Sequence, residues 1–170
     1  VPATALLVGI APMHSHAQEA FRQNRADVSG RSGAVVAGHP LAAAAGYEVL
    51  RRGGNAVDAA VTMAGVLAVV RPHMNGVGGD AFALFYDASS KRITGLNGSG
   101  RAGALATPEF FTARGHHDVP DDGPLTITVP GAVSAWAAAL ERYGTITLAE
   151  ALAPAIDLAE NGWVVTATLQ

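Results

Sequence analysis

Arg101 is the charged residue of this sequence whose surroundings are best suited to binding a small ligand. It ends the segment 96–101 (LNGSGR), which directly follows a predicted strand. Glycines allow a loop to approach a ligand closely, and a guanidinium binds a carboxylate through two hydrogen bonds. The segment therefore predicts a carboxylate site at Arg101, and the alternative is an ordinary solvent-exposed arginine of a loop.

A second glycine-dense segment, residues 75–80 (NGVGGD), connects a predicted helix to a predicted strand. Gly76, Gly78 and Ala81 formally match a dinucleotide fingerprint, but that motif requires the reverse order, with the strand before the helix. The order of elements therefore argues against nucleotide binding. We expect these glycines to pack the connection tightly beside a ligand cavity.

Other catalytic or metal-binding arrangements have little support in the sequence. The chain has no cysteine, which excludes disulfides, zinc–thiolate sites and cysteine nucleophiles. No G-x-S-x-G motif is present, and no motif supplies a base for Ser99, although the sequence leaves a Ser-His-Asp triad open. No two histidines have the H-x-x-x-H spacing of helical metal ligands, so we expect neither a metal nor a cofactor.

The composition is typical of one folded domain. Of the 170 residues, 49% are hydrophobic and 15% are charged, so the chain can bury a sizeable core. The net charge is −3 and no lysine or arginine cluster occurs, which argues against a nucleic-acid partner. The most apolar stretch, residues 56–70, contains Asp58 and is shorter than the roughly 18 residues of a membrane span.

The first 17 residues resemble the remnant of a signal peptide. Residues 2–11 are mostly apolar, and Ser15-His16-Ala17 has the small-x-small pattern of a cleavage site. The alternative is a helical or disordered lead-in. Residues 18–33 are polar and predict a linker, and residues 34–170 are expected to form the folded part. A signal peptide would place the protein in the periplasm or outside the cell, with the cytoplasm as the alternative.

Two helices are predicted in the first half of the folded part. Residues 34–37 predict a buried strand, and residues 40–52 predict a helix that begins at a proline and ends at glycines. The next helix, residues 56–70, has Asn55 as its N-cap and Asp58 in a capping-box position. Because that helix is apolar on nearly every face, we expect it to be the most buried element.

The second half predicts a strand pair followed by helices. Residues 81–86 predict a core strand and residues 92–96 its return strand. A short helix opens at residues 107–109, residues 126–129 are expected to be extended, and a helix follows up to Tyr143. A last helix, residues 148–161, has Thr147 as its N-cap and Glu150 in its capping box. Helices flanking a strand pair define an α+β fold class.

Several sequence blocks together resemble the γ-glutamyltransferase family of N-terminal-nucleophile hydrolases. They occur in the family's order and cover the chain from about residue 35 to its end. The blocks are residues 53–60 (GGNAVDAA), 75–80 (NGVGGD), 128–133 (TVPGAV), 142–145 (RYGT) and 154–162 (PAIDLAENG).

The resemblance implies a precursor that cuts itself before a catalytic threonine. It implies that this threonine lies beyond Gln170, so that no catalytic residue is expected within the chain. The family hydrolyses or transfers γ-glutamyl groups of amides such as glutathione through that threonine. The implied fold is a four-layer αββα sandwich, of which this chain would supply a helix-rich front segment. The implied partners are a γ-glutamyl or acyl-amide substrate and the C-terminal small subunit of the same precursor.

One departure from the family pattern concerns substrate binding. By the resemblance, the substrate-binding arginine of glutathione-type members falls on Ser99, and Arg101 is displaced from it by two residues. Asn97, Ser99 and Arg101 are therefore the substrate-binding candidates. The pattern resembles the cephalosporin-acylase-like branch, so an amide hydrolase of that kind is one alternative. A non-catalytic binding domain sharing the fold is another.

Overall fold

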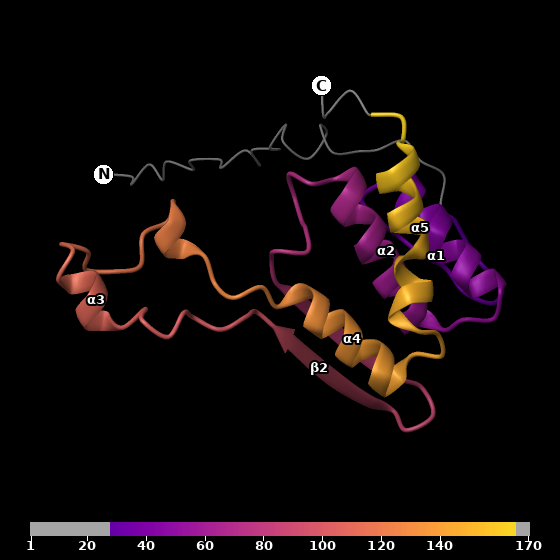
Figure 1. Ribbon diagram of the computed structural model, residues 1–170. Coiled ribbons are helices and arrows are strands. Elements are labelled where there is room, and N and C mark those ends of the chain that lie inside the picture. Colours follow the sequence, from indigo (N-terminus) through magenta and orange to yellow (C-terminus); the bar gives the residue numbers. More distant parts are fainter. Residues whose placement is uncertain (1–27, 166–170) are drawn as a thin grey trace, which may run out of the picture. The chain divides into compact units, whose positions relative to one another are not determined.

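Five α-helices and one two-stranded sheet form the described part of the chain, residues 28–165, in a computed structural model (Figure 1). The proposed signal peptide, residues 1–17, and most of the predicted linker, residues 18–33, lie outside the described residues. The chain divides into Val1–Arg31 and Ser32–Gln170. All helices and strands described below belong to the second of these units.

Local signals set the bounds of the first two helices. Helix α1 spans Pro40–Arg51, and the imidazole of His39 caps its first turn. Gly53 then ends the helix with a φ of +95°, a backbone conformation that glycine adopts without strain. Helix α2 spans Ala56–Val70 and begins with the predicted capping box of Asn55 and Asp58, which satisfies two of its free backbone donors.

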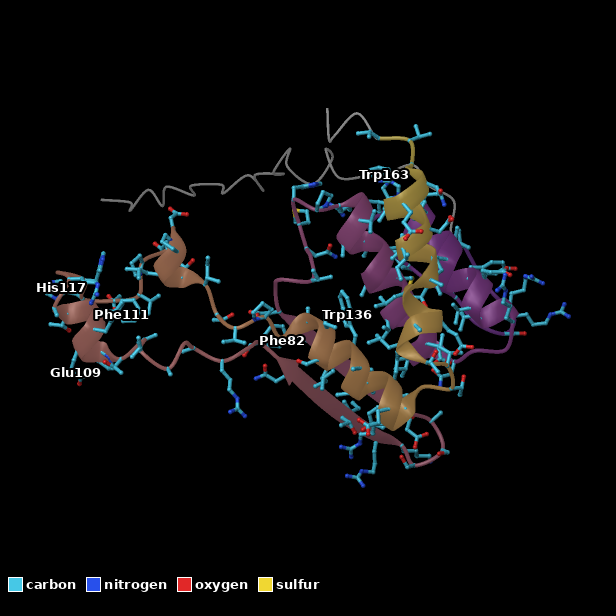
Figure 2. All side chains as sticks on the ribbon, viewed as in Figure 1. Phe82, Glu109, Phe111, His117, Trp136 and Trp163 are labelled. Carbon is cyan, nitrogen blue, oxygen red and sulfur yellow. The ribbon has the colours of Figure 1, made fainter. Side chains whose placement is uncertain are left out.

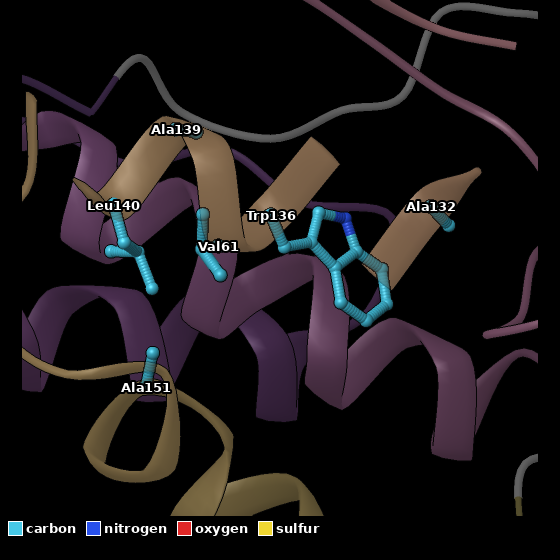
Figure 3. Close-up of a cluster of buried hydrophobic side chains, with 6 residues drawn as sticks. All are labelled: Val61, Ala132, Trp136, Ala139, Leu140 and Ala151. Carbon is cyan, nitrogen blue, oxygen red and sulfur yellow. The ribbon is translucent and has the colours of Figure 1, made fainter. Parts of the chain in front are cut away.

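Helix α2 lies at the centre of the helical part and packs against α1, α4 and α5. Helix α4 spans Ala132–Tyr143. Helix α5 spans Leu148–Asn161 and begins with the predicted capping box of Thr147 and Glu150. Seven residues of α2 are buried, more than in any other described element, so the prediction for α2 is confirmed. Val61 of α2 meets Trp136 and Leu140 of α4 in one core cluster (Figure 3).

The sheet is an antiparallel pair of β1, Ala81–Asp87, and β2, Arg92–Gly98. Helix α4 covers one face, where Phe85 and Leu96 pack against the cluster of Val61 and Trp136. The other face is open, and Phe82 and Leu84 are 67% and 80% exposed (Figure 2). The prediction of a core strand is therefore wrong for alternate residues of β1. Successive side chains of a strand point to opposite faces, and the described residues cover only one of them.

Two further predicted segments differ from the structure. Residues 34–37 form no strand, and Val36 is 91% exposed. A strand requires a hydrogen-bonded neighbour, and β1 pairs only with β2 within residues 28–165. The segment 126–129 is not extended throughout, because η2, a 3₁₀ turn, spans Pro124–Thr126. The short helix α3 forms as predicted and spans Pro108–Thr112.

Candidate functional site

The three predicted substrate-binding residues line one cavity of about 420 Å³. Two segments form it: the end of β2 with the loop after it, and the residues that lead into α4. Its lining consists of Asn97, Gly98, Ser99, Gly100, Arg101, Val129, Pro130, Gly131 and Ser134. We call this cavity the Arg101 pocket. The sequence predicted that the first segment belongs to a ligand site. It did not predict that residues 129–134 line the same site.

Glycines bring the two walls of the Arg101 pocket into backbone contact. Gly100 has a φ of +69°, and a Cβ there would collide with the carbonyl oxygen of Val129. A Cβ on Gly131 would collide with the carbonyl oxygen of Gly98 and would lie 2.6 Å from the Gly100 nitrogen. The Val129 N–H donates to the Arg101 carbonyl at 2.8 Å. The loop that carries Arg101 is therefore held at a fixed place beside the start of α4.

The start of α4 depends on the glycine-dense segment 75–80. Gly131 precedes α4 and supplies no side-chain cap. Instead, the Gly79 carbonyl accepts the N–H groups of Gly131 and Ala132 at 3.1 and 2.9 Å, which satisfies donors that a helix start leaves free. This carbonyl connects the glycine-dense segment to the wall of the Arg101 pocket.

The expected tight packing of the glycine-dense segment is wrong for Gly76 and Gly78. Neither has a positive φ, and a Cβ at either position would meet no atom within 4 Å. Both glycines line a second cavity of about 540 Å³, which also borders Trp136 and Ala155. The physical reason is that both glycines border open space in this cavity, so a side chain there would meet no neighbour. Packing within the described residues does not explain why glycine stands at these two positions.

Hydrogen bonds order the polar side chains of the Arg101 pocket. The Asn97 side-chain oxygen accepts the Ser99 N–H at 3.0 Å, a local turn that fixes the loop. The Ser134 hydroxyl donates to the Gly131 carbonyl at 2.8 Å. Asn97 and Arg101 are exposed, and Ser99 is half-buried. All three residues line the pocket, and Asn97 also supports the loop.

Arg101 gives the Arg101 pocket its charge. It is the one charged side chain of the lining. The ion pairs found among residues 28–165 join Glu48 to Arg51 and Arg52, so no carboxylate of the described chain neutralises Arg101. An arginine without a carboxylate partner can bind an anionic group of a ligand through two hydrogen bonds. No general base lies among the residues that line the Arg101 pocket.

The histidines do not join this site. Within the described residues, no three His, Cys, Asp or Glu side chains lie close enough to hold a metal ion. His117 lines a small cavity beside α3 together with Phe111 (Figure 2). His39 caps α1. His14 and His16 lie outside the described residues.

Comparisons with known proteins show what the chain is similar to. A family model described as Gamma-glutamyltranspeptidase matches residues 42–170. A glutathione hydrolase-like YwrD proenzyme of Bacillus subtilis is 45% identical over 141 residues, which is 82% of this chain and 26% of that protein.

Two solved structures are similar as well. The γ-glutamyltranspeptidase of Helicobacter pylori superimposes with a TM-score of 0.77 at 36% identity, over 85% of this chain and 42% of that chain. The cephalosporin acylase of Bacillus halodurans superimposes with a TM-score of 0.72 at 43% identity, over 88% of this chain and 29% of that chain.

The fold is thus the α+β front segment of the N-terminal-nucleophile hydrolases that these structures represent. The chain belongs to the γ-glutamyltranspeptidase family. It spans between 26% and 29% of the length of the first two curated relatives. Both relatives are proenzymes. No described helix has the length and hydrophobicity needed to cross a membrane.

Proposed function

We propose that this chain supplies the carboxylate-binding part of an amide hydrolase or transferase. The substrate is a γ-glutamyl amide such as glutathione, or a related acyl amide with a free carboxylate. Arg101 binds that carboxylate, Ser99 lines the same pocket, and Asn97 orders the loop between them. The single observation that carries the proposal is the pocket of about 420 Å³ that gathers these three residues. The nucleophile is a threonine beyond Gln170, freed by self-cleavage of the precursor.

The strength of one such contact is sufficient to select substrates. A hydrogen bond to a charged group contributes about 1.5–3 kcal/mol, or roughly 10- to 150-fold in binding. The fork of the guanidinium matches both oxygens of a carboxylate, whereas a lysine ammonium presents a single charged point. An acyl donor without a carboxylate gains nothing from Arg101. The Arg101 pocket therefore selects the acyl part of the substrate.

An acylase-like amide hydrolase is the second candidate. The displacement of the arginine from position 99 to position 101 favours it, as does the similarity to a cephalosporin acylase. In this case the carboxylate belongs to an acyl group other than γ-glutamyl. A non-catalytic binding domain is the third possibility, and an open reading frame after Gln170 with a Thr-Thr or Thr-Ser processing site would argue against it.

Partners and location follow from the same proposal. The C-terminal small subunit of the precursor is the expected protein partner, and the proenzyme relatives support it. The apolar pattern of residues 2–11 supports a periplasmic or secreted enzyme. A cytoplasmic enzyme is the alternative.

The test compares two acyl donors in the complete precursor, one with and one without a free carboxylate. Arg101→Lys should raise KM for the carboxylate donor by about tenfold or more, with little change for the other donor. Arg92→Lys is the matched control, because Arg92 is an exposed arginine of β2 outside the pocket. Equal and small effects of Arg101→Lys on KM for both donors would show that Arg101 does not bind the substrate carboxylate. Self-cleavage should persist in both variants.

A further inference from the structure

An asparagine followed by a glycine can lose its side-chain amide without an enzyme, because glycine has no Cβ to crowd its nitrogen. That nitrogen must give up its proton and reach the Cγ of the asparagine. A hydrogen bond that holds the glycine N–H or the asparagine side chain opposes both steps. The sequence contains three such pairs, and all three asparagines are exposed to water: Asn75-Gly76, Asn97-Gly98 and Asn161-Gly162.

The pair Asn161-Gly162 is held by hydrogen bonds at the end of α5. The Asn161 side-chain amide donates to the Asp157 carboxylate at 2.8 Å. The Gly162 N–H donates to the Leu158 carbonyl at 3.1 Å. Both reacting groups of this pair are therefore occupied, although the pair is exposed.

The pair Asn97-Gly98 is held by the sheet. Both residues belong to β2 and pair with β1. The Asn97 side-chain oxygen accepts the Ser99 N–H at 3.0 Å. A Cβ on Gly98 would collide with Ala135 of α4, so the backbone has no room to rotate toward the side chain.

The pair Asn75-Gly76 has none of these restraints. Within residues 28–165, the Gly76 N–H donates to no backbone carbonyl. The side-chain bonds that hold Asn97 and Asn161 have no counterpart at Asn75 in this part of the chain. A Cβ on Gly76 or Gly78 would meet no atom within 4 Å. The segment therefore has the space that closure of a five-membered ring requires.

We infer that Asn75 is a site of spontaneous deamidation and isoaspartate formation. Hydroxide removes the proton of the Gly76 N–H, and this nitrogen attacks the Asn75 Cγ. The new C–N bond closes a succinimide ring, the bond from Cγ to Nδ2 breaks, and the amide nitrogen leaves as ammonia with a proton from water. Water then opens the ring at either carbonyl, which gives aspartate or isoaspartate.

The position of Asn75 gives this modification a consequence for the fold. Isoaspartate routes the main chain through Cβ, inside the glycine-dense segment 75–80. The Gly79 carbonyl of that segment accepts the N–H groups of Gly131 and Ala132. Conversion of Asn75 should therefore loosen the start of α4, and with it one wall of the Arg101 pocket.

Peptide mapping by mass spectrometry tests the inference in one sample. The 170-residue chain is kept in mildly alkaline buffer, and conversion of the three asparagines is followed with time. Asn75 should convert faster than Asn97 and Asn161 by about tenfold or more, because hydrogen bonds must first open at the other two sites. In concentrated urea the three rates should become similar, since the sequence pair is the same.

Two glycine variants separate the chemistry from general mobility of the segment. Gly76→Ala places a methyl group beside the attacking nitrogen and should slow conversion of Asn75 severalfold. Gly78→Ala is the matched control, because its Cβ would also meet open space and its φ is not positive. That variant should convert Asn75 at the wild-type rate.

Hydrogen exchange of the converted chain measures the effect on the fold. Anion exchange separates this chain by its added negative charge. Its Gly131 and Ala132 amides should exchange faster than those of the unconverted chain, whereas amides in the middle of α2 should not change.

Three results would overturn the assignment of Asn75. The first is equal conversion of the three asparagines in native buffer. The second is an Asn75 that stays intact in native buffer while urea allows its conversion. The third is an equal slowing by Gly76→Ala and Gly78→Ala. Unchanged exchange of Gly131 and Ala132 after conversion would overturn the link to α4.

Discussion

Asp58 and Thr145 are joined by two hydrogen bonds, although they lie 87 residues apart in the sequence. The Thr145 N–H and hydroxyl donate to the two carboxylate oxygens of Asp58 at 2.8 and 2.6 Å. The same carboxylate accepts the Asn55 N–H at 2.8 Å to complete the capping box of α2. The Asn55 side chain in turn donates to the Tyr143 carbonyl at 2.6 Å. The start of α2 thus holds the turn between α4 and α5.

Asp58→Asn should lower the free energy of unfolding by about 2–4 kcal/mol. The Asp58 side chain is fully buried. The amide of an asparagine would place an N–H donor against the N–H and hydroxyl donors of Thr145. Urea unfolding at pH 7 measures the change. Asp157→Asn is the matched control, because Asp157 is an exposed aspartate of α5, and its loss should cost less than about 0.5 kcal/mol. Equal losses in both variants would contradict the importance of the Asp58 contacts.

The contribution of Asp58 should also be visible in how the free energy of unfolding depends on pH. Burial opposes its ionisation most strongly, but hydrogen bonds from Thr145, Asn55 and Ile146 outweigh burial and hold its pKa below the ordinary value. Because the pKa of Asp58 is lower in the folded state, its carboxylate stabilises the fold. This stabilisation is complete at pH values above the pKa of an aspartate in the unfolded state, about 3.9. That stability is lost as the pH falls further, through the folded pKa. Unfolding free energies between pH 5 and 2.5 should fall more steeply for the wild type than for Asp58→Asn, and parallel curves would count against this account.

Val61→Asp should destabilise the chain by about 3–5 kcal/mol or prevent folding. Val61 is 4% exposed in the cluster with Trp136 and Leu140, so the new carboxylate would be buried without a partner. Ala60→Asp is the control, because it adds the same charge to an exposed position of the same helix. Circular dichroism and urea unfolding measure both variants. A Val61→Asp chain as stable as Ala60→Asp would show that this face of α2 is not core.

Gly131→Ala should cost about 1–3 kcal/mol of stability. Its Cβ would collide with the backbone of Gly98 and Gly100, so the two walls of the Arg101 pocket would have to separate. Gly76→Ala is the matched control, since its Cβ would meet open space and its φ is not positive. That variant should be neutral, or more stable by about 0.4–1 kcal/mol. Thermal unfolding compares the two, and a neutral Gly131→Ala would mean that the walls can move apart freely.

The 170-residue chain alone should not release the chromophore from a γ-glutamyl anilide. The Arg101 pocket contains an arginine and two serines among its side chains, but no base among the residues that line it. Serine hydroxyls are weak nucleophiles without an adjacent base. The measurement compares purified chain with a heat-treated sample. Turnover well above that control, and retained through stringent purification, would require a nucleophile within the chain.

Most element boundaries could be predicted from the sequence because their causes are local. The capping boxes of Asn55 with Asp58 and of Thr147 with Glu150 join residues three positions apart. Gly53 and Gly162 end helices through their own positive φ. In each case a few consecutive residues contain both partners of the interaction. The apolar run of α2 likewise determined that this helix would be buried.

The sequence also indicated part of the site, because Asn97 lies at the end of β2, and Ser99 and Arg101 come directly after it. Only the tertiary structure decided that Val129–Gly131 forms the opposite wall, since that contact depends on backbone approach between segments about 30 residues apart. The tertiary structure also decided that Asp58 binds Thr145. Within the described residues, it left residues 34–37 without a strand partner and one face of β1 open. Periodicity and capping patterns report on neighbours along the chain. Pairing across the fold depends on which surfaces meet, and only the packed helices and sheet determine that.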